Sequence, residues 1–422
     1  MNPPAQLHWL ENGIEQSVRW RSESGALPPR RVVLADDTMG ADAAYRLACE
    51  GTALLWRGDF HHARQMLQAL ARRADRKPRR SARATAAGGE TTAPPTPAQA
   101  FHLHRQAQAQ RARVLGMLII PLAADYSVPL RRAPDFRDAC TEAWDADART
   151  ARDGAASVVS LRELSGVVGA HEWRKKGVEV ASLGGPGHNR IHPHYGVFSP
   201  VRGEYVQLVA QAPLPSSTLA FDIGVGTGVL SAVLAHRGVQ RVVATDQDPR
   251  ALACARDNLQ RLGLQERVEV VQADLFPSLA LYGQAALIVC NPPWVPARAS
   301  TPVEHAVYDP ESRMLRGFLD GLATHLAPQG EGWLVLSDLA EHLGLRPREQ
   351  LLGWIEAAGL AVLGRIDVRP RHPKAGDASD PLHAARAAEI TAIKGKKTDA
   401  IASILGYAHH DCLIHRDDLV IL

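Results

Sequence analysis

Four consecutive residues in the second half of the chain could do chemistry on a nitrogen: Asn291, Pro292, Pro293 and Trp294. An amide or aromatic amine nitrogen is a poor nucleophile because its lone pair is delocalised, so a catalyst must hold the NH₂ group and aim that lone pair at an electrophile. The side-chain carbonyl of Asn291 and the backbone carbonyl of Pro292 can accept hydrogen bonds from the two N–H groups of this NH₂. Proline fixes the local backbone, so both carbonyls are oriented in advance. The ring of Trp294 can stack on the planar group that carries the nitrogen.

A glycine-rich stretch, residues 222–228, could hold the second reactant. It follows a strand candidate and opens a helix, where Gly224, Gly226 and Gly228 let the chain turn tightly and bring backbone amides against a ligand. Asp246 ends the next strand candidate about 20 residues later, where an acidic side chain accepts hydrogen bonds from a ribose diol. NAD or another adenosine-containing cofactor satisfies both features.

The glycine spacing separates these cofactors, because NAD-binding loops favour G-x-G-x-x-G, whereas this loop has G-x-G-x-G preceded by Asp222. That arrangement resembles motif one of class I S-adenosylmethionine-dependent methyltransferases, and the resemblance implies S-adenosyl-L-methionine as the cofactor. It places Asp274, after the third strand candidate, near the adenine amine, and Leu275 in backbone contact with the ring. Ordinary helix capping is the alternative for either Asp246 or Asp274, but two aspartates at consecutive strand ends favour the ligand. The residues assigned to the cofactor are Asp222, Gly224, Gly226, Gly228, Asp246, Asp274, Leu275 and Asn291.

The Asn-Pro-Pro-Trp motif resembles that of amino-methyltransferases, and among them the HemK-like glutamine methyltransferases, which modify a glutamine amide in release factors or a ribosomal protein. Residues 198–206, 308–311 and 317–322 resemble further stretches of that family, and the resemblance covers residues 195–370. The chain departs from the family at Trp294, where the glutamine enzymes usually carry Tyr, and at residues 199–202, where Ser-Pro-Val-Arg replaces a Pro-Arg-Pro run. The resemblance therefore supports the identity of the methyl donor better than the identity of the methyl acceptor.

The resemblance implies a methyltransferase that acts on an NH₂ nitrogen, with Asn291, Pro292, Pro293 and Trp294 as its catalytic residues. The first hypothesis for the acceptor is a glutamine amide of a protein, such as a translation factor or ribosomal protein. The alternative is an exocyclic base amine in RNA or DNA. A third hypothesis is a domain that binds the cofactor or a partner without catalysis, and the intact motif argues against it.

The elements that must position these residues alternate between short apolar runs and amphipathic stretches, which is typical of a parallel sheet with helices on both faces. Strands are predicted at residues 218–223, 241–245, 268–272, 286–290, 332–336, 361–368 and 390–393. Helices are predicted at 249–262 and 347–358, each followed by glycine. The expected fold is a seven-stranded, Rossmann-like α/β methyltransferase domain over residues 195–422.

Residues 1–170 are expected to form a mainly helical domain for substrate recognition, because apolar residues recur at spacings of three and four over residues 41–73 and the pattern continues over 101–150 and 158–173. Between them, residues 74–100 combine a basic run with an Ala/Thr/Gly/Pro tract and are predicted to be a flexible linker.

Composition narrows the function further. The net charge is only +3, and only seven of the 48 basic residues are Lys. Guanidinium suits phosphate recognition, but the accompanying abundance of Ala and Pro favours a composition bias that raises Arg throughout the chain. The five cysteines stand singly, which indicates reduced thiols.

His188, His192 and His194 lie close together in the sequence and could ligate a metal. No carboxylate or thiolate stands nearby in the sequence, so no metal is predicted. The loop that carries these histidines is expected to border the donor or substrate pocket. No apolar run is long enough for a membrane helix and the start lacks a signal peptide, so the expected compartment is the cytoplasm.

Overall fold

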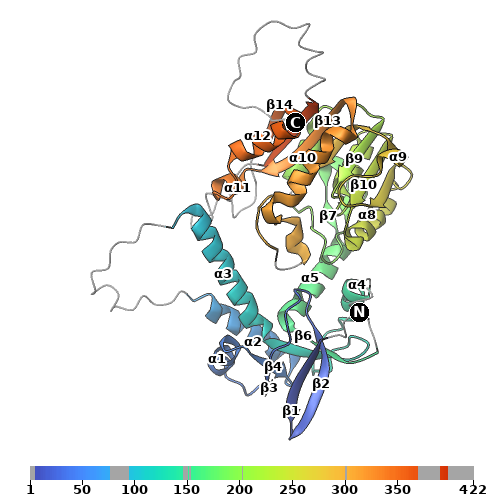
Figure 1. Ribbon diagram of the computed structural model, residues 1–422. Coiled ribbons are helices and arrows are strands. Elements are labelled where there is room, and N and C mark those ends of the chain that lie inside the picture. The colour runs from blue at the N-terminus through green and yellow to red at the C-terminus, as the bar shows by residue number, and fades with distance from the viewer. Residues whose placement is uncertain are drawn as a thin grey trace, which may run out of the picture. The chain divides into compact units, whose positions relative to one another are not determined.

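The computed structural model describes residues 5–76, 95–145, 151, 154–201, 203–299, 302–368 and 390–397. The chain forms two compact units, Met1–Glu172 and Trp173–Leu422 (Figure 1). We call them the N-terminal unit and the C-terminal unit. Helix α5 (Leu161–Lys176) crosses the division between them.

The N-terminal unit is built on a six-stranded sheet with the order β1-β2-β6-β5-β4-β3. Strands β3, β4 and β5 run parallel, and β6 is antiparallel to β5. Helix α1 connects β3 to β4, and α2 and α3 connect β4 to β5. The strands are β1 (Gln6–Glu11), β2 (Ile14–Arg21), β3 (Arg31–Ala35), β4 (Thr52–Trp56), β5 (Leu118–Leu122) and β6 (Ser157–Ser160). The helices are α1 (Ala41–Cys49), α2 (Phe60–Ala74), α3 (Pro97–Gly116) and α4 (Arg137–Trp144).

The prediction of a mainly helical N-terminal domain omits the six-stranded sheet on which this unit is built. The stretch 41–73, predicted to be helical, contains α1 and α2, but all five residues of β4 between them are buried in the sheet. Gly51, with φ +79°, follows the end of α1, so the chain turns into β4 there. A short strand that is buried on both faces lacks a period of two, so its leucines match a helical spacing equally well. The predicted linker is bounded by α2, which ends at Ala74, and by α3, and its residues 77–94 lie outside the described residues.

The C-terminal unit confirms the predicted α/β fold. Its seven-stranded sheet has the order β11-β10-β9-β12-β13-β15-β14, in which the first five strands are parallel and β15 is antiparallel to both neighbours. All seven predicted strands are present. They are β9 (Leu219–Ile223), β10 (Arg241–Asp246), β11 (Val268–Gln272), β12 (Ala285–Cys290), β13 (Leu326–Ser337), β14 (Leu360–Val368) and β15 (Ile390–Lys397). A small antiparallel pair, β7 (Val178–Glu179) and β8 (Arg190–Ile191), precedes this sheet.

Helices cover both faces of this sheet, as a parallel arrangement requires. Successive residues of β12 point to opposite sides, so Val289 joins one buried cluster and Ile288 joins the other. The first cluster includes residues of α6 (Glu204–Gln211), α7 (Val229–His236) and α8 (Pro249–Arg261). The second includes residues of α10 (Arg313–His325) and α12 (Arg348–Ala357). Short helices lie at α9 (Leu279–Tyr282) and α11 (Leu339–His342).

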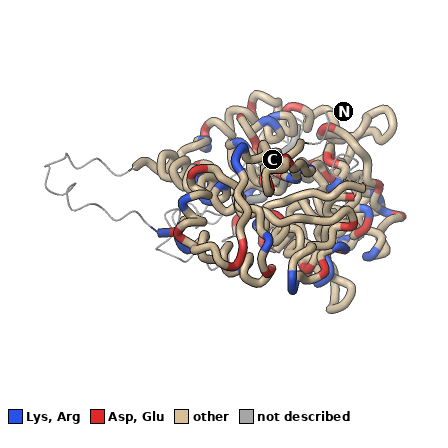
Figure 2. The backbone as a smooth tube through the Cα atoms, turned by 90° about the horizontal axis from the view of Figure 1, so that it is seen from below, with Lys and Arg blue, Asp and Glu red and all other residues tan. Residues whose placement is uncertain are grey.

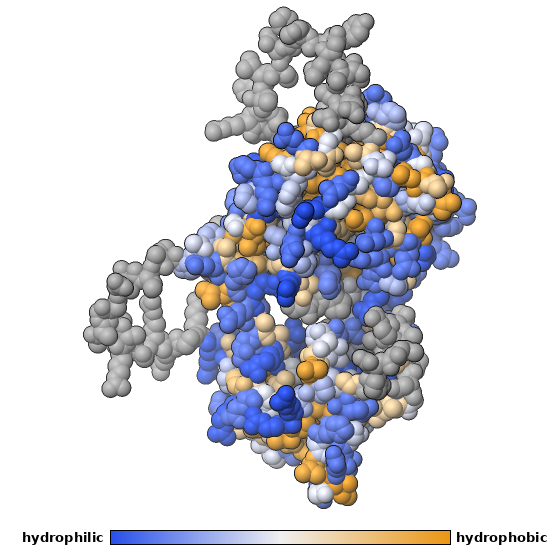
Figure 3. Space-filling model, viewed as in Figure 1, coloured by the Kyte–Doolittle hydropathy of each residue, from blue (hydrophilic) through white to orange (hydrophobic). Residues whose placement is uncertain are grey.

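The surface carries both signs of charge. Basic and acidic residues are interspersed along the backbone in the view of Figure 2. The face in Figure 3 is largely hydrophilic, and the orange atoms at its lower tip lie over the β1–β2 hairpin, where Leu10 and Ile14 are exposed. In the part of the chain that the structure describes, every helix is too short or too polar to cross a bilayer.

Candidate active site

The glycine-rich loop leaves the carboxyl end of β9 and leads into α7. Gly224, Gly226 and Gly228 have φ values of +82°, +51° and +83°, a region that residues with a Cβ adopt only with strain. The backbone N–H groups of Gly224 and Val225 donate to the carbonyl of Thr245 at 2.9 and 2.8 Å, which fastens the loop to the end of β10. A Cβ added to Gly226 would have no neighbour within 4 Å, so the backbone there faces open space that a ligand can fill.

Asp246 ends β10 beside this loop. Its Oδ2 accepts the N–H of Gly226 at 3.2 Å, and its Oδ1 accepts the N–H of Asp248 at 2.9 Å. Burial raises the pKa of Asp246, although these backbone hydrogen bonds oppose the shift. Each carboxylate oxygen keeps a further lone pair, so the residue can accept from the two hydroxyls of a ribose diol. The loop and Asp246 therefore fit an adenosine-containing cofactor such as S-adenosyl-L-methionine.

Asp222 lies in β9, two residues before Gly224, and is almost fully buried. Its Oδ2 accepts the hydroxyl hydrogen of Ser231 at 2.6 Å, so the carboxyl bridges the strand and the helix on either side of the loop. Burial raises its pKa to about 6, against the lowering effect of the Ser231 hydrogen bonds. The structure thus places Asp222 where it can hold the loop in shape.

Asp274 and Leu275 follow β11 but occupy different environments. The Asp274 side chain is 67% exposed and forms an ion pair with Arg313 at 3.4 Å. Leu275 has φ +73°, and its carbonyl accepts the hydroxyl hydrogen of Thr245 at 2.5 Å. Leu275 is therefore held at the end of β10 next to the glycine loop, whereas Asp274 stands at the solvent-exposed rim. The adenine contacts expected of both residues remain a prediction.

The Asn-Pro-Pro-Trp motif emerges from β12 next to the same loop. Cys290, the last residue of β12, is paired with Ile223 of β9, so Asn291 and Gly224 leave neighbouring strands at the same level. The indole N–H of Trp294 donates to Asn291 Oδ1 at 2.9 Å. This bond fixes the orientation of the Asn291 amide and leaves a second lone pair on Oδ1 for an incoming N–H. The two prolines are buried, and Asn291 and Trp294 are half-buried.

A buried arginine, Arg346, contacts the backbone of the Asn-Pro-Pro-Trp motif. Arg346 is only 3% exposed; its Nη2 donates to the carbonyl of Trp294 at 3.4 Å, and its Nη1 donates to Ser312 Oγ at 3.2 Å. Burial lowers the pKa of Arg346, and the nearby carboxylates of Glu341 and Asp309 oppose that shift. These negative charges reduce the cost of burying the guanidinium.

Asp309 ties the same region to the start of α10. Its carboxylate accepts the backbone N–H groups of Met314 and Leu315 at 3.1 and 3.2 Å, and its own N–H donates to the carbonyl of Val295 at 2.9 Å. Asp309 lies in the 308–311 stretch that the sequence resemblance singled out. Nothing in the sequence pattern pointed to Arg346, because its partners are distant in the chain.

The histidine loop is attached to α8 and, through it, to the glycine loop. His194 Nε2 lies 3.1 Å from Asp257 Oδ2, and His192 Nδ1 lies 2.6 Å from the carbonyl of Arg174. The buried Asn258 side-chain amide donates to the carbonyls of both His192 and Thr227, at 3.2 and 3.0 Å. Asn258 thereby connects the histidine loop with the cofactor loop. Among the described residues, no group of three or more His, Cys, Asp or Glu side chains is placed to hold a metal ion.

Comparison with known proteins agrees with this geometry. Residues 188–353 match the methyltransferase small domain family. The chain is 31% identical over 185 residues to the release factor glutamine methyltransferase of Cereibacter sphaeroides, which covers 40% of this chain and 63% of that protein. It is 29% identical over 171 residues to the tRNA1(Val) (adenine(37)-N6)-methyltransferase of Shewanella amazonensis, covering 37% of this chain and 72% of that protein.

A methyltransferase structure from Pyrococcus furiosus aligns with a TM-score of 0.36 at 16% identity, over 55% of this chain and 98% of that chain. The chain spans 38% to 63% of the length of four release factor glutamine methyltransferases that it matches. The residues matched by the family, 188–353, include the glycine loop and the Asn-Pro-Pro-Trp motif. The chain is also 30% identical over 159 residues to the tRNA1(Val) (adenine(37)-N6)-methyltransferase of Bacteroides fragilis, covering 35% of this chain and 67% of that protein. The chain belongs to the class I S-adenosylmethionine-dependent methyltransferases, and it also resembles the HemK-like glutamine methyltransferases.

Proposed function

We propose that this protein transfers a methyl group from S-adenosyl-L-methionine to the side-chain amide nitrogen of a glutamine in a protein, such as a translation factor or ribosomal protein. The observation that carries the proposal is the Asn291–Trp294 hydrogen bond at the end of β12, next to the glycine loop. It presents a carbonyl oxygen with a free lone pair at the place where an acceptor nitrogen must meet the donor.

The residues divide the work as follows. S-adenosyl-L-methionine supplies a methyl group already activated by a positively charged sulfur. Asn291 Oδ1 and the carbonyl of Pro292 accept hydrogen bonds from the two N–H groups of the acceptor amide. These bonds turn the lone pair of the amide nitrogen towards the donor. The same two oxygens favour the positive charge that develops on the nitrogen, and Trp294 covers one face of the planar amide. Orientation supplies much of the rate, because the transfer is direct: the bond between nitrogen and methyl forms as the bond between sulfur and methyl breaks, and the nitrogen then loses one N–H proton to water.

A base amine of RNA or DNA is the second candidate acceptor. Similarity to the tRNA1(Val) adenine methyltransferases favours it, because the chain is also 30% identical to the Bacteroides fragilis protein over 67% of its length. A large indole such as that of Trp294 can stack on a purine as well as on an amide. A grip on nucleic acid would call for a concentrated basic surface, whereas the charges seen in Figure 2 are mixed.

Asn291→Ala tests the mechanism. The variant is expected to bind S-adenosyl-L-methionine in calorimetry but to lose about 100-fold or more in transfer of a labelled methyl group to cell extract. Gln265→Ala, which removes an exposed amide elsewhere in the C-terminal unit, is the matched control and should transfer normally. Wild-type turnover in Asn291→Ala would exclude the proposed role of the amide.

The same labelled extract identifies the acceptor. Protease should release the label and nuclease should not if the acceptor is a protein, and acid hydrolysis should then yield labelled methylamine from the modified amide. Release of label by nuclease alone would establish the base amine instead. Donor binding without any labelled product would indicate a domain that binds but does not catalyse.

A further inference from the structure

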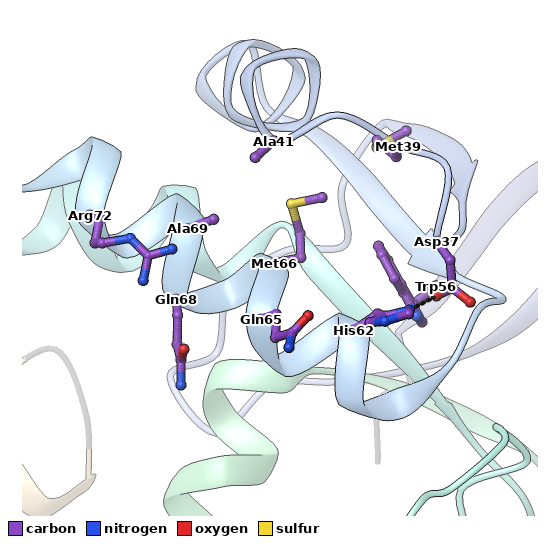
Figure 4. Close-up of a pocket in the computed structure, with 10 residues that line it drawn as sticks. All are labelled: Asp37, Met39, Ala41, Trp56, His62, Gln65, Met66, Gln68, Ala69 and Arg72. Carbon is purple, nitrogen blue, oxygen red and sulfur yellow. Dashed lines mark ion pairs between the residues drawn. The ribbon is translucent and has the colours of Figure 1, made fainter.

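A groove in the N-terminal unit lies at the carboxyl edge of its parallel strands, where α/β sheets commonly bind ligands. It is open to solvent and has a volume of about 600 Å³ between the loop after β3, the start of α1 and one side of α2 (Figure 4). The floor includes Trp56, the last residue of β4, and Met39 and Met66 contribute flexible apolar side chains. A volume of this size suits a few amino-acid side chains.

One end of the groove carries the carboxylate of Asp37 beside the imidazole of His62, and the fold specifies how this carboxylate is held. Asp37 Oδ1 accepts the backbone N–H of Asp59 at 2.9 Å and lies 3.1 Å from His62 Nδ1, while neither contact uses Oδ2. A Cβ added to Gly58 would collide with this carboxylate and come within 2.8 Å of the Asp37 backbone nitrogen. Glycine at position 58 is therefore needed to seat the carboxylate, whose side chain remains 32% exposed.

The other end of the groove is basic. Arg72 lines it from the last part of α2, and the exposed side chains of Gln65 and Gln68 lie between it and His62 (Figure 4). His62 and Arg72 are ten positions apart on one helix, which corresponds to about 15 Å. The groove thus offers a carboxylate, then two amides, then a guanidinium along about three helical turns.

This order of groups fits an extended peptide better than a nucleic acid. A strand rises about 3.3 Å per residue, so four or five residues cover the distance. A basic side chain complements Asp37, an acidic one complements Arg72, and the glutamine amides can pair with peptide N–H and C=O groups between them. A phosphodiester chain would place negative charge against Asp37, which costs binding energy.

We propose that this groove binds an extended segment of the protein acceptor that carries a basic residue about four positions from an acidic one. The inference rests on the proposed protein substrate, and it names the contact by which the N-terminal unit recognises that substrate. Affinity is expected to be modest, because the groove presents only two charged contacts.

Methionine-methyl NMR on the full chain tests the groove directly. The chain has five methionines, of which Met39 and Met66 line the groove, while Met314 lies beside Gly224 of the cofactor loop. The probes are capped pentapeptides of one length with Lys and Glu at opposite ends in both directions, with Lys at both ends, with Glu at both ends, or with Ala at both ends. The Lys/Glu peptides should shift Met39 and Met66 and leave Met314 unmoved. If the methyl signals of Met39 and Met66 do not shift at peptide concentrations up to about 5 mM, or shift equally with the Ala peptide, the proposal is overturned.

Charge reversal supplies the matched test. Arg72→Glu should weaken the Lys/Glu peptides about tenfold and strengthen the peptide with Lys at both ends. Arg64→Glu reverses an exposed charge on the same helix outside the groove and should change neither affinity. Oligouridylate serves as the nucleic-acid probe: if it shifts Met39 and Met66 in an Arg72-dependent way and the peptides do not, the groove binds nucleic acid.

Methyl transfer then separates this inference from the proposed function. With the labelled protein acceptor, Arg72→Glu should raise KM about tenfold and keep kcat, while S-adenosyl-L-methionine still shifts Met314. An unchanged KM would refute docking of the acceptor in the groove. If instead no protein is ever labelled although the peptides still shift Met39 and Met66, the groove binds peptides and the proposed acceptor is wrong.

Discussion

Replacing Asp222 with Asn should make the C-terminal unit more stable at neutral pH but not at acid pH. Asp222 is 1% exposed, and its charged form is disfavoured because burial removes it from water. The asparagine keeps an oxygen that can accept the Ser231 hydroxyl and carries no charge. The substitution therefore removes the cost of ionisation with little change in shape.

The expected magnitude follows from the pKa. A carboxyl pKa of about 6 in the fold, against an ordinary value of 3.8, corresponds to about 3 kcal/mol. The folded state holds the proton over the range in which the unfolded chain has lost it, so wild-type stability falls as pH rises from 3.8 to about 6 and stays lower above that. Between about pH 4.5 and pH 7.5, the stability of Asp222→Asn relative to wild type should rise by about 2 kcal/mol.

Hydrogen exchange at the amides of β9 and β12 measures this, because it reports opening of the C-terminal unit separately from the N-terminal unit. Amides of β4 and β5 provide the internal reference, and Glu266→Gln, at an exposed position, is the control for loss of a carboxylate. A difference between Asp222→Asn and wild type that stays constant from about pH 4.5 to pH 7.5 would show that Asp222 does not titrate there, and the burial argument would be wrong.

Three further substitutions test the loops at the site. Arg346→Lys keeps the charge near Asp309, but an ammonium cannot contact both Ser312 and the Trp294 carbonyl as a guanidinium does. Turnover should therefore fall about tenfold, while donor affinity measured by calorimetry stays unchanged. A loss of donor affinity would contradict this role of Arg346. Trp294→Phe removes the hydrogen bond to Asn291, so it should lower kcat and reduce the free energy of unfolding in urea by about 1 kcal/mol. Trp354→Phe on α12 should leave kcat unchanged. Equal effects of the two substitutions on kcat would contradict the role of this hydrogen bond. Gly224→Ala combines φ +82° with a contact of 2.7 Å to Met314 and should lower the melting temperature more than Gly226→Ala, whose added Cβ meets open space; the reverse order would refute the packing argument.

The C-terminal sheet was predictable because its strands are short apolar runs, and four of them, β9 to β12, also carry a chemical signal at the carboxyl end. The strand before Gly224 and the strand before Asn291 are of this kind, and the structure confirms that they are neighbours. Their adjacency brings together residues that are far apart in sequence, which is the general consequence of placing loops at one edge of a parallel sheet. Asp222 was identified from its place in the motif, but its bond to Ser231 needed the fold.

Other features had no local signal. Arg346 lies 52 positions after Trp294 and 34 after Ser312, so only tertiary structure shows that one buried guanidinium contacts both. In the N-terminal unit, β4 was hidden because a strand buried on both faces has the same apolar spacing as a helix core. The groove beside it depends on Gly58 and Asp37, which in sequence are an ordinary turn glycine and one of two adjacent aspartates.

The polar support of the Asn-Pro-Pro-Trp motif lies wholly within the C-terminal unit: Trp294 holds Asn291, and Arg346 holds Trp294 against Ser312 beside the charge of Asp309. None of these bonds distinguishes a glutamine amide from an adenine amine, because both present a planar NH₂ group to the same oxygen. Discrimination between the two must therefore come from contacts made with the rest of the acceptor molecule. The groove proposed to bind the acceptor has a carboxylate at one end and a guanidinium at the other, so it would select against a polyanion and for a peptide with two opposite charges. For this reason, variants of the N-terminal unit should change KM for the acceptor, whereas variants around Asn291 should change kcat.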